Sequence, residues 1–189
     1  PSLNMQVSIT PLNNINYGTS TSATGSETNT GDGGLTYNLY RDGVLVSNPN
    51  SETLNAGTYN YTYNTTGGVN YTLGSVNATL TVNKIGNAVS FLINDGTTNL
   101  TLVYPQQVNA SASSVSGVLS LFRNGTNVLS QNGINVTLGV GFYEYFVNSS
   151  GNQNYLANST GRYLSVNITP EPNTQPPTTS IFSPLPSTN

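Results

Sequence analysis

The feature that most constrains this chain is an internal repeat. Residues 54–67 read LNAGTYNYTYNTTG, and residues 138–151 read LGVGFYEYFVNSSG. Large side chains fill every second position of both copies: Tyr59, Tyr61, Tyr63 and then Tyr143, Tyr145, Val147. A period of two is that of a strand with one face in a core. The repeat therefore predicts two similar β modules, each built around one aromatic strand.

The same order of elements surrounds both copies of the repeat. Asp42-Gly43, between two runs of alternating apolar residues, supplies the positive φ angles that a two-residue hairpin turn needs. Asn124-Gly125 takes the same place in the second copy, and the closing strands read LTVN (80–83) and LSVN (164–167). We expect one core to contain Leu39, Tyr59, Tyr61, Leu80 and Val82, and the other to contain Leu121, Tyr143, Tyr145, Leu164 and Val166.

The start of each repeat follows a leucine-x-x-glycine-x-tyrosine pattern, at Leu54 and again at Leu138. This pattern resembles the tyrosine corner of immunoglobulin-like sandwiches, where a tyrosine at the start of strand F ties down the incoming loop. With the YRDG or FRNG hairpin and the closing strands, residues 5 to 169 resemble the tandem immunoglobulin-like repeats of large prokaryotic surface proteins, particularly those of archaea. The resemblance implies an all-β fold with two tandem β-sandwich modules.

The domain organisation follows from the repeat and from proline content. We expect module 1 at residues 1–84, module 2 at residues 85–169 and a proline-rich tail at residues 170–189. Six of the ten prolines fall in that tail, which favours a polyproline spacer over a third module. The short connector between the modules predicts a stiff rod. Because the first residue is Pro1, we interpret the sequence as a mature or excised segment.

Composition excludes several classes of function. The 189 residues include no cysteine, histidine or tryptophan, which excludes most metal, thiol and histidine chemistry. Charged residues make up 6% and the net charge is −3, so we expect no nucleic-acid partner. No apolar run approaches the roughly 20 residues that span a bilayer, so we expect no membrane insertion.

The candidates for chemistry are few. Seven acidic residues are scattered, mostly in turns, which argues against the paired carboxylates of a glycosidase. A calcium site at Asp32 and Asp42 has too few oxygen ligands at defined spacing. Lys84 is either a solvated linker residue or a cross-linking lysine, and we favour the former. We therefore expect no enzymatic activity, no cofactor and no bound metal.

Sequons for N-glycosylation are abundant. Asn64 and Asn148 share one repeat position, expected at a hairpin tip, and Asn60 and Asn77 fall on the outward parity of their strands. Outward parity favours attached glycans over an unmodified Asn-rich surface. The eleven candidate sites are Asn60, Asn64, Asn70, Asn77, Asn99, Asn109, Asn124, Asn135, Asn148, Asn158 and Asn167.

These features together predict a non-enzymatic, extracellular structural protein, a subunit or segment of a glycosylated cell-surface filament, stalk or layer. The alternative is an adhesin whose exposed aromatic residues bind carbohydrate or a host surface. The candidate aromatics are Tyr40, Phe122, Tyr71 and Tyr155, which otherwise cap the sandwich ends or fill the contact between modules. A viral fibre or capsid protein would use the same rod-like modules.

The two ends of the chain suggest how copies meet. The predicted subunit contacts are Leu3, Met5, Val7 and Ile9 at the start and Ile181, Phe182 and Leu185 in the tail. One end segment would be donated to an open sheet edge of the next copy, joining copies head to tail into a homopolymer. The competing interpretation makes the first segment strand A of its own module and the tail a disordered linker.

Overall fold

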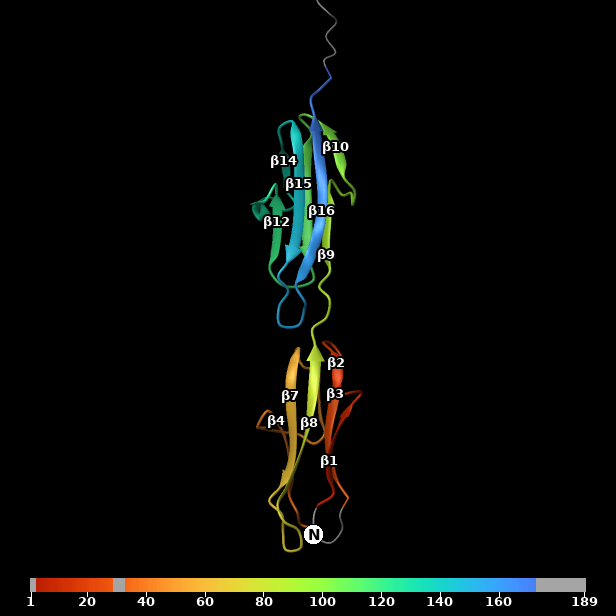
Figure 1. Cartoon of the computed structure of the whole chain (residues 1–189), viewed down its shortest axis with the longest axis vertical. Coiled ribbons are helices and arrows are strands. Elements are labelled where there is room, and N and C mark those ends of the chain that lie inside the picture. Colours follow the sequence, from red (N-terminus) through yellow and green to blue (C-terminus); the bar gives the residue numbers. More distant parts are fainter. Residues whose placement is uncertain (1–2, 29–32, 173–189) are drawn as a thin grey trace, which may run out of the picture.

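The computed structural model describes residues 3–28 and 33–172 and shows two β-sandwiches stacked end to end (Figure 1). Module 1 contains β1 to β8 and module 2 contains β9 to β16. Over the described residues, the helical content is a single 3-10 turn, η1 (Leu129–Gln131). The predicted all-β fold with two tandem immunoglobulin-like sandwiches is thereby confirmed.

Module 1 packs a three-stranded sheet, in the order β1-β3-β6, against a five-stranded sheet, in the order β2-β8-β7-β4-β5. Its strands are β1 (Met5–Thr10), β2 (Asn14–Asn16), β3 (Thr21–Glu27), β4 (Tyr37–Arg41), β5 (Val44–Val46), β6 (Asn50–Glu52), β7 (Gly57–Thr65) and β8 (Gly74–Asn83).

Module 2 repeats this arrangement, with one sheet in the order β14-β11-β9 and the other in the order β10-β16-β15-β12-β13. Its strands are β9 (Val89–Ile93), β10 (Leu100–Val103), β11 (Gln107–Ser114), β12 (Leu119–Arg123), β13 (Thr126–Asn127), β14 (Asn135–Thr137), β15 (Gly141–Ser149) and β16 (Asn158–Thr169).

The first strand of each module changes sheets, which the sequence pattern did not predict. After β1 pairs antiparallel with β3, the chain continues into β2, which pairs parallel with β8. In module 2 the same step leads from β9 to β10, which pairs parallel with β16. Three polar-flanked residues such as Asn14–Asn16 give no alternation to detect, and only the neighbouring closing strand makes them a strand.

The predicted tyrosine corner is present in both modules. The Tyr59 hydroxyl donates to the Asn55 carbonyl at 2.8 Å, and the Tyr143 hydroxyl donates to the Gly139 carbonyl at 3.1 Å. These two tyrosines pack only partly against the cores. Two residues further on, Tyr61 and Tyr145 are buried completely or nearly so. The remaining predicted core residues are buried, so the alternation identified the inward faces correctly.

The predicted hairpin turns are also confirmed. Asp42 and Gly43 have φ angles of 50° and 80°, and Asn124 and Gly125 have φ angles of 49° and 78°. Two successive positive φ angles define the turn that matches the twist of a β-hairpin. Both turns end β4 or β12 at the same position, which fixes the register of the strand pairs that follow.

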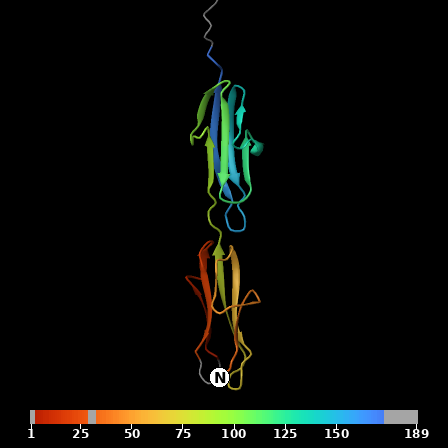
Figure 2. The ribbon, with the colours of Figure 1, turned by 180° about the vertical axis from the view of Figure 1, so that it is seen from behind.

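The junction between modules is formed by the loop between β15 and β16. Figure 1 and Figure 2 show this loop reaching beside the linker toward the upper end of module 1. The Asn154 side chain accepts a hydrogen bond from the Ala56 amide and donates one to Asn55 Oδ1, both at 2.9 Å. The Tyr17 and Tyr155 rings meet edge-on at 5.8 Å. The modules are therefore held by contacts additional to the linker peptide.

The linker itself continues the pairing. The Ile85 amide donates to the Asn154 carbonyl at 3.0 Å, and the Leu156 amide donates to the Ile85 carbonyl at 2.8 Å. Lys84 is exposed, and its Nζ donates to the Asn152 carbonyl at 2.8 Å. The linker lysine thus contacts the junction loop through its ammonium group, in agreement with a solvated linker residue.

Candidate functional site

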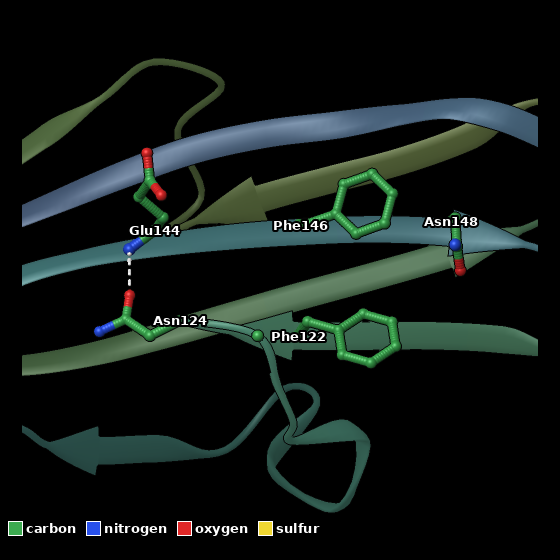
Figure 3. Close-up of a pocket in the computed structure, with 6 residues that line it drawn as sticks. Phe122, Asn124, Glu144, Phe146 and Asn148 are labelled. Atoms are coloured by element: carbon green, nitrogen blue, oxygen red, sulfur yellow. Dashed lines mark hydrogen bonds between the residues drawn. The ribbon is translucent and has the colours of Figure 1, made fainter.

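A shallow groove of about 420 Å³ lies on the outward face of the five-stranded sheet of module 2. Two phenylalanines, Phe122 on β12 and Phe146 on β15, form its floor, with ring centroids 6.1 Å apart and planes inclined by 27°. Its other lining residues are Asn124, Gly125, Glu144 and Asn148. Figure 3 shows the two rings side by side, with Asn148 beyond one end and Asn124 and Glu144 beyond the other.

Strand parity places these side chains together. In β15, Tyr145 and Val147 point into the core, so Glu144, Phe146 and Asn148 share the opposite face. Phe122 is the direct cross-strand partner of Phe146 in the antiparallel pair of β12 and β15. Side chains directly opposite each other lie close enough to pack. The groove is therefore a product of one register between two strands.

The hairpin turn holds the polar end of the groove. Asn124 has a positive φ angle, and its Oδ1 accepts a hydrogen bond from the Glu144 backbone amide at 2.8 Å (Figure 3). Asp42 makes the same bond to the Asn60 amide in module 1, at 2.8 Å. Asp42 is thus a turn residue in the structure, and Asp32 lies outside the described residues.

An aromatic floor with a carboxylate and two amides at its ends can bind a sugar ring. Sugar rings present C–H groups on one face, which pack on aromatic rings, and hydroxyls at the edge, which bond to carboxylates and amides. Neither phenylalanine is fully buried, so both ring surfaces contribute to the outer face of the sheet. The groove is therefore chemically suited to a saccharide.

Of the two rings, only Phe122 is a candidate predicted from the sequence. Phe146 is not predicted, because the repeat indicates only the inward-facing positions of its strand. A signal existed, since module 1 has Thr62 where module 2 has Phe146. Of the other candidates, Tyr155 fills the module junction, while Tyr40 lies opposite Thr62 on module 1 and Tyr71 lies in the loop before β8.

None of the eleven sequon asparagines is buried. Asn64 and Asn148 lie inside β7 and β15, one residue before the strand ends, so the prediction of a hairpin tip is wrong. The strands continue farther than the alternation suggested because Thr65 and Ser149 still point inward. Both asparagines keep the predicted outward parity.

The side-chain amides of these asparagines differ in their hydrogen bonds. The difference bears on glycosylation because a sugar attaches to Nδ2. Asn77, Asn99 and Asn124 accept hydrogen bonds through Oδ1, so a sugar can attach to Nδ2 without breaking these hydrogen bonds. Asn109 instead donates from Nδ2 to both the Gly133 carbonyl and Asn135 Oδ1. A sugar on Asn109 would displace at least one of these bonds.

The predicted subunit-contact residues at the start of the chain pack within their own module. Met5, Val7 and Ile9 alternate inward along β1 and contact the core of module 1, and Leu3 lies beside Gly74 of β8. The chain start is thus strand A of its own sandwich, pairing with β3. The tail residues Ile181, Phe182 and Leu185 lie outside the described residues.

A polar cluster in module 1 links three strands. Arg41 and Glu52 form an ion pair at 2.7 Å, and Asn50 Oδ1 accepts bonds from Arg41 and from the Tyr61 hydroxyl. The bond from the Asn50 amide, then the Arg41 guanidinium, lowers the Glu52 pKa. Burial raises the pKa of Tyr61. The cluster satisfies the hydroxyl of a fully buried tyrosine, which is a structural task.

Among the described residues, no three histidine, cysteine, aspartate or glutamate side chains gather as metal ligands. In the same residues, no helix has the length and apolar character needed to cross a membrane. The groove on module 2 therefore stands as the candidate site of the described chain.

Comparison with known proteins adds solved structures only, because no family model and no curated protein matches the chain. Fibronectin(III)-like modules of Clostridium thermocellum CbhA match with 14% identity and a TM-score of 0.34, over 87% of this chain and 95% of theirs. The I9-I11 tandem from titin matches with 11% identity and a TM-score of 0.34, over 90% of this chain and 66% of that one. At this similarity neither bears on function, and the strand order and tyrosine corners define the fold.

Proposed function

We propose that this chain is a non-enzymatic, extracellular structural protein, a subunit or segment of a glycosylated cell-surface filament, stalk or layer. The observation that carries the proposal is the module junction. Contacts through Asn154, Tyr155 and Lys84 add to the linker peptide and resist bending between the modules. Specific contacts that hold two sandwiches in line are suited to a protein that spans a distance.

The rod is tested by loosening the junction without touching either core. Replacing Asn154 with Ala removes two hydrogen bonds between modules, so the modules should bend relative to each other. The distance distribution from small-angle X-ray scattering should then shift toward shorter distances. In the sugar-free recombinant chain, Asn70→Ala is the matched control, because it alters the equivalent loop at the other end of module 1. Equal scattering from wild type and both variants would remove the junction as the basis of the proposal.

Glycosylation is the second element of the proposal, supported by eleven sequons on a surface where none is buried. The native protein should have a mass above the 19.9 kDa of the bare chain. Intact-mass measurement of material from the native source tests this. A native mass equal to that of the bare chain would contradict the glycoprotein and its surface location.

Head-to-tail joining of copies is supported by the two ends of the rod. The loop between β7 and β8 carries Val69 and Leu73, 97% and 76% exposed, and its equivalent in module 2 is the loop that docks on module 1. At the opposite end, Val140 and Tyr104 are 55% and 44% exposed. Apolar groups at both ends would be covered if copies met end to end.

Donation of a strand would strengthen that contact, and the tail is the better donor because β1 already pairs within its own module. Sheet edges such as β1 and β6 present unpaired backbone groups to an incoming strand. Deleting residues 178–189 should therefore abolish polymers while both modules stay folded. A truncated chain that assembles normally would exclude the tail as donor.

The second candidate function is an adhesin, favoured by the Phe122–Phe146 groove. An adhesin would bind a free saccharide from its surroundings, and Phe146→Thr would abolish that binding. Screening sugar-free recombinant chain against immobilised glycans distinguishes the two functions, since a pure spacer would retain none.

A further inference from the structure

The groove on module 2 contains a sequon asparagine as part of its own lining. Asn148 begins the sequence Asn148-Ser149-Ser150 and stands two residues beyond Phe146 on the same face of β15. Two residues of an antiparallel strand span about 6.8 Å. A sugar linked to Asn148 Nδ2 therefore starts within one ring width of the aromatic floor.

The other end of the groove lies farther along the same face of β15. Glu144 lies four residues before Asn148 on the same face, which is roughly 13 Å along the strand. That length accommodates two linked sugar rings. Figure 3 shows the order Asn148, then the two phenylalanine rings, then Glu144 and Asn124. The first ring would cover the aromatic pair and the second would reach the carboxylate and the amide.

We infer that the glycan on Asn148 folds back along β15 and packs on Phe122 and Phe146, with its second sugar hydrogen-bonded to the Glu144 carboxylate. The inference rests on the proposed glycosylation and names the residue that carries this glycan and the surface that binds it. Tethering raises the effective concentration of the sugar far above that of a free saccharide, so a shallow groove suffices. The tethered glycan would also cover the groove against outside ligands.

The chemistry of the groove selects the class of glycan. Glu144 accepts hydrogen bonds from hydroxyl or amide groups and repels acidic sugars, so the second ring is a neutral hexose or an N-acetylated hexosamine. Asn124 is the other sequon asparagine in the lining, but in Figure 3 its Nδ2 points away from the rings. Asn148 is therefore the attachment site.

A second groove, of about 330 Å³, touches Asn148 from the opposite side and is lined by Val118, Ser120 and Asn158 among others. It contains no aromatic ring among its lining residues. A glycan lying there would not respond to changes at Phe122 or Phe146. The two positions are thus separable by experiment.

The experiment uses the full chain made in a host that attaches N-glycans, with site occupancy mapped by peptide mass spectrometry. Carbon–proton correlation spectra should show sugar protons of the Asn148 glycan shifted upfield by the phenylalanine ring currents. Phe146→Thr should abolish the shift, and module 1 shows that the fold tolerates threonine there, since Thr62 holds the equivalent place. Enzymatic removal of glycans should lower the Tm of module 2 by several degrees in wild type and much less in F146T.

Two further variants sharpen the result. Ser150→Ala removes the sequon and leaves the groove, so its spectra should lack the shifted signals. Thr62→Phe places a second aromatic beside Tyr40 and two residues before Asn64, so it should create shifted signals from the Asn64 glycan in module 1 while removing the Asn60 sequon. An occupied Asn148 without shifted signals, or with signals unchanged in F146T, overturns the inference and leaves the glycoprotein proposal standing.

Absence of sugar at Asn148 with sugar at other sequons also overturns the inference alone. Absence of sugar at every sequon, in native material as well, overturns the proposed glycoprotein together with the inference. Binding of cellobiose, maltose or N,N′-diacetylchitobiose by the glycosylated wild type would contradict a covered groove and favour the adhesin.

Discussion

The two modules have the same strand arrangement, but different side chains occupy one pair of equivalent positions in their cores. In module 1, Tyr63 lies over Gly25, where an added Cβ would overlap its ring. The equivalent pair in module 2 is Val147 and Ala112. An asparagine clamps each inner strand in the same way, with Asn48 bonded to the amide and carbonyl of Gly25 and Asn132 to those of Ala112. A larger side chain on one sheet is thus compensated by a smaller one on the other.

The outward faces differ as much as the cores. Module 2 has Phe122 opposite Phe146, whereas module 1 has Tyr40 opposite Thr62. Outward positions do not affect the packing between sheets, so they are free to vary between copies of one fold. The inward residues thus specify the sandwich, and the outward residues specify the surface that each module presents.

The largest expected effect comes from the tyrosines that both modules bury. Tyr61→Ala and Tyr145→Ala each remove a ring that is 0% or 2% exposed, and each should destabilise its own module by roughly 3–5 kcal/mol. Hydrogen exchange on the full chain, resolved by peptide, measures the two modules separately. Equal loss of protection in both modules would mean that they unfold as one unit.

The pairing of the large Tyr63 with the small Gly25 across the core of module 1 can be tested by substitution. Gly25→Ala should cost about 1–3 kcal/mol, because the new methyl group meets the Tyr63 ring. Adding Tyr63→Val removes the overlapping ring, so it should cost less in the Gly25→Ala background than in the wild type. Urea unfolding of the two single variants and the double variant checks this, and strictly additive losses would refute the compensation.

The tyrosine corners should respond alike in the two modules. Tyr59→Phe and Tyr143→Phe each remove one hydrogen bond to a loop carbonyl and leave the ring in place. The expected loss is about 0.5–1.5 kcal/mol in each module, measured by urea unfolding. Unchanged stability in both variants would show that the corner constrains the loop without stabilising the fold.

The smallest effect is a difference in acid sensitivity. The hydrogen bond from Asn50, and then Arg41, lower the Glu52 pKa, so folding favours the ionised form. Its stabilisation is therefore present above the pKa of the unfolded chain and is lost as pH falls through the lower folded pKa. In module 2, Arg123 bonds instead to Gln131, which does not titrate. Hydrogen exchange at decreasing pH should show module 1 losing protection first, and Glu52→Gln should abolish the difference.

Much of the fold was predictable because strand and turn signals are local. Alternation gave the inward faces of β7, β8, β15 and β16, and two-residue turns gave both hairpins. The short strands β2 and β10 were not predictable, since they owe their conformation to a neighbouring strand. The predicted module boundary after residue 84 falls between the end of β8 at Asn83 and the start of β9 at Val89.

The all-β class, the repeat, the hairpins and the parity of the long alternating strands follow from the sequence, because they depend on residues close together in the chain. Which outward residues become neighbours depends on the tertiary structure. Phe122 meets Phe146 through the register of two strands, and Asn154 bonds to Asn55 across a separation of 99 residues. Periodicity specifies which face a side chain occupies, but only long-range pairing specifies what lies beside it on that face.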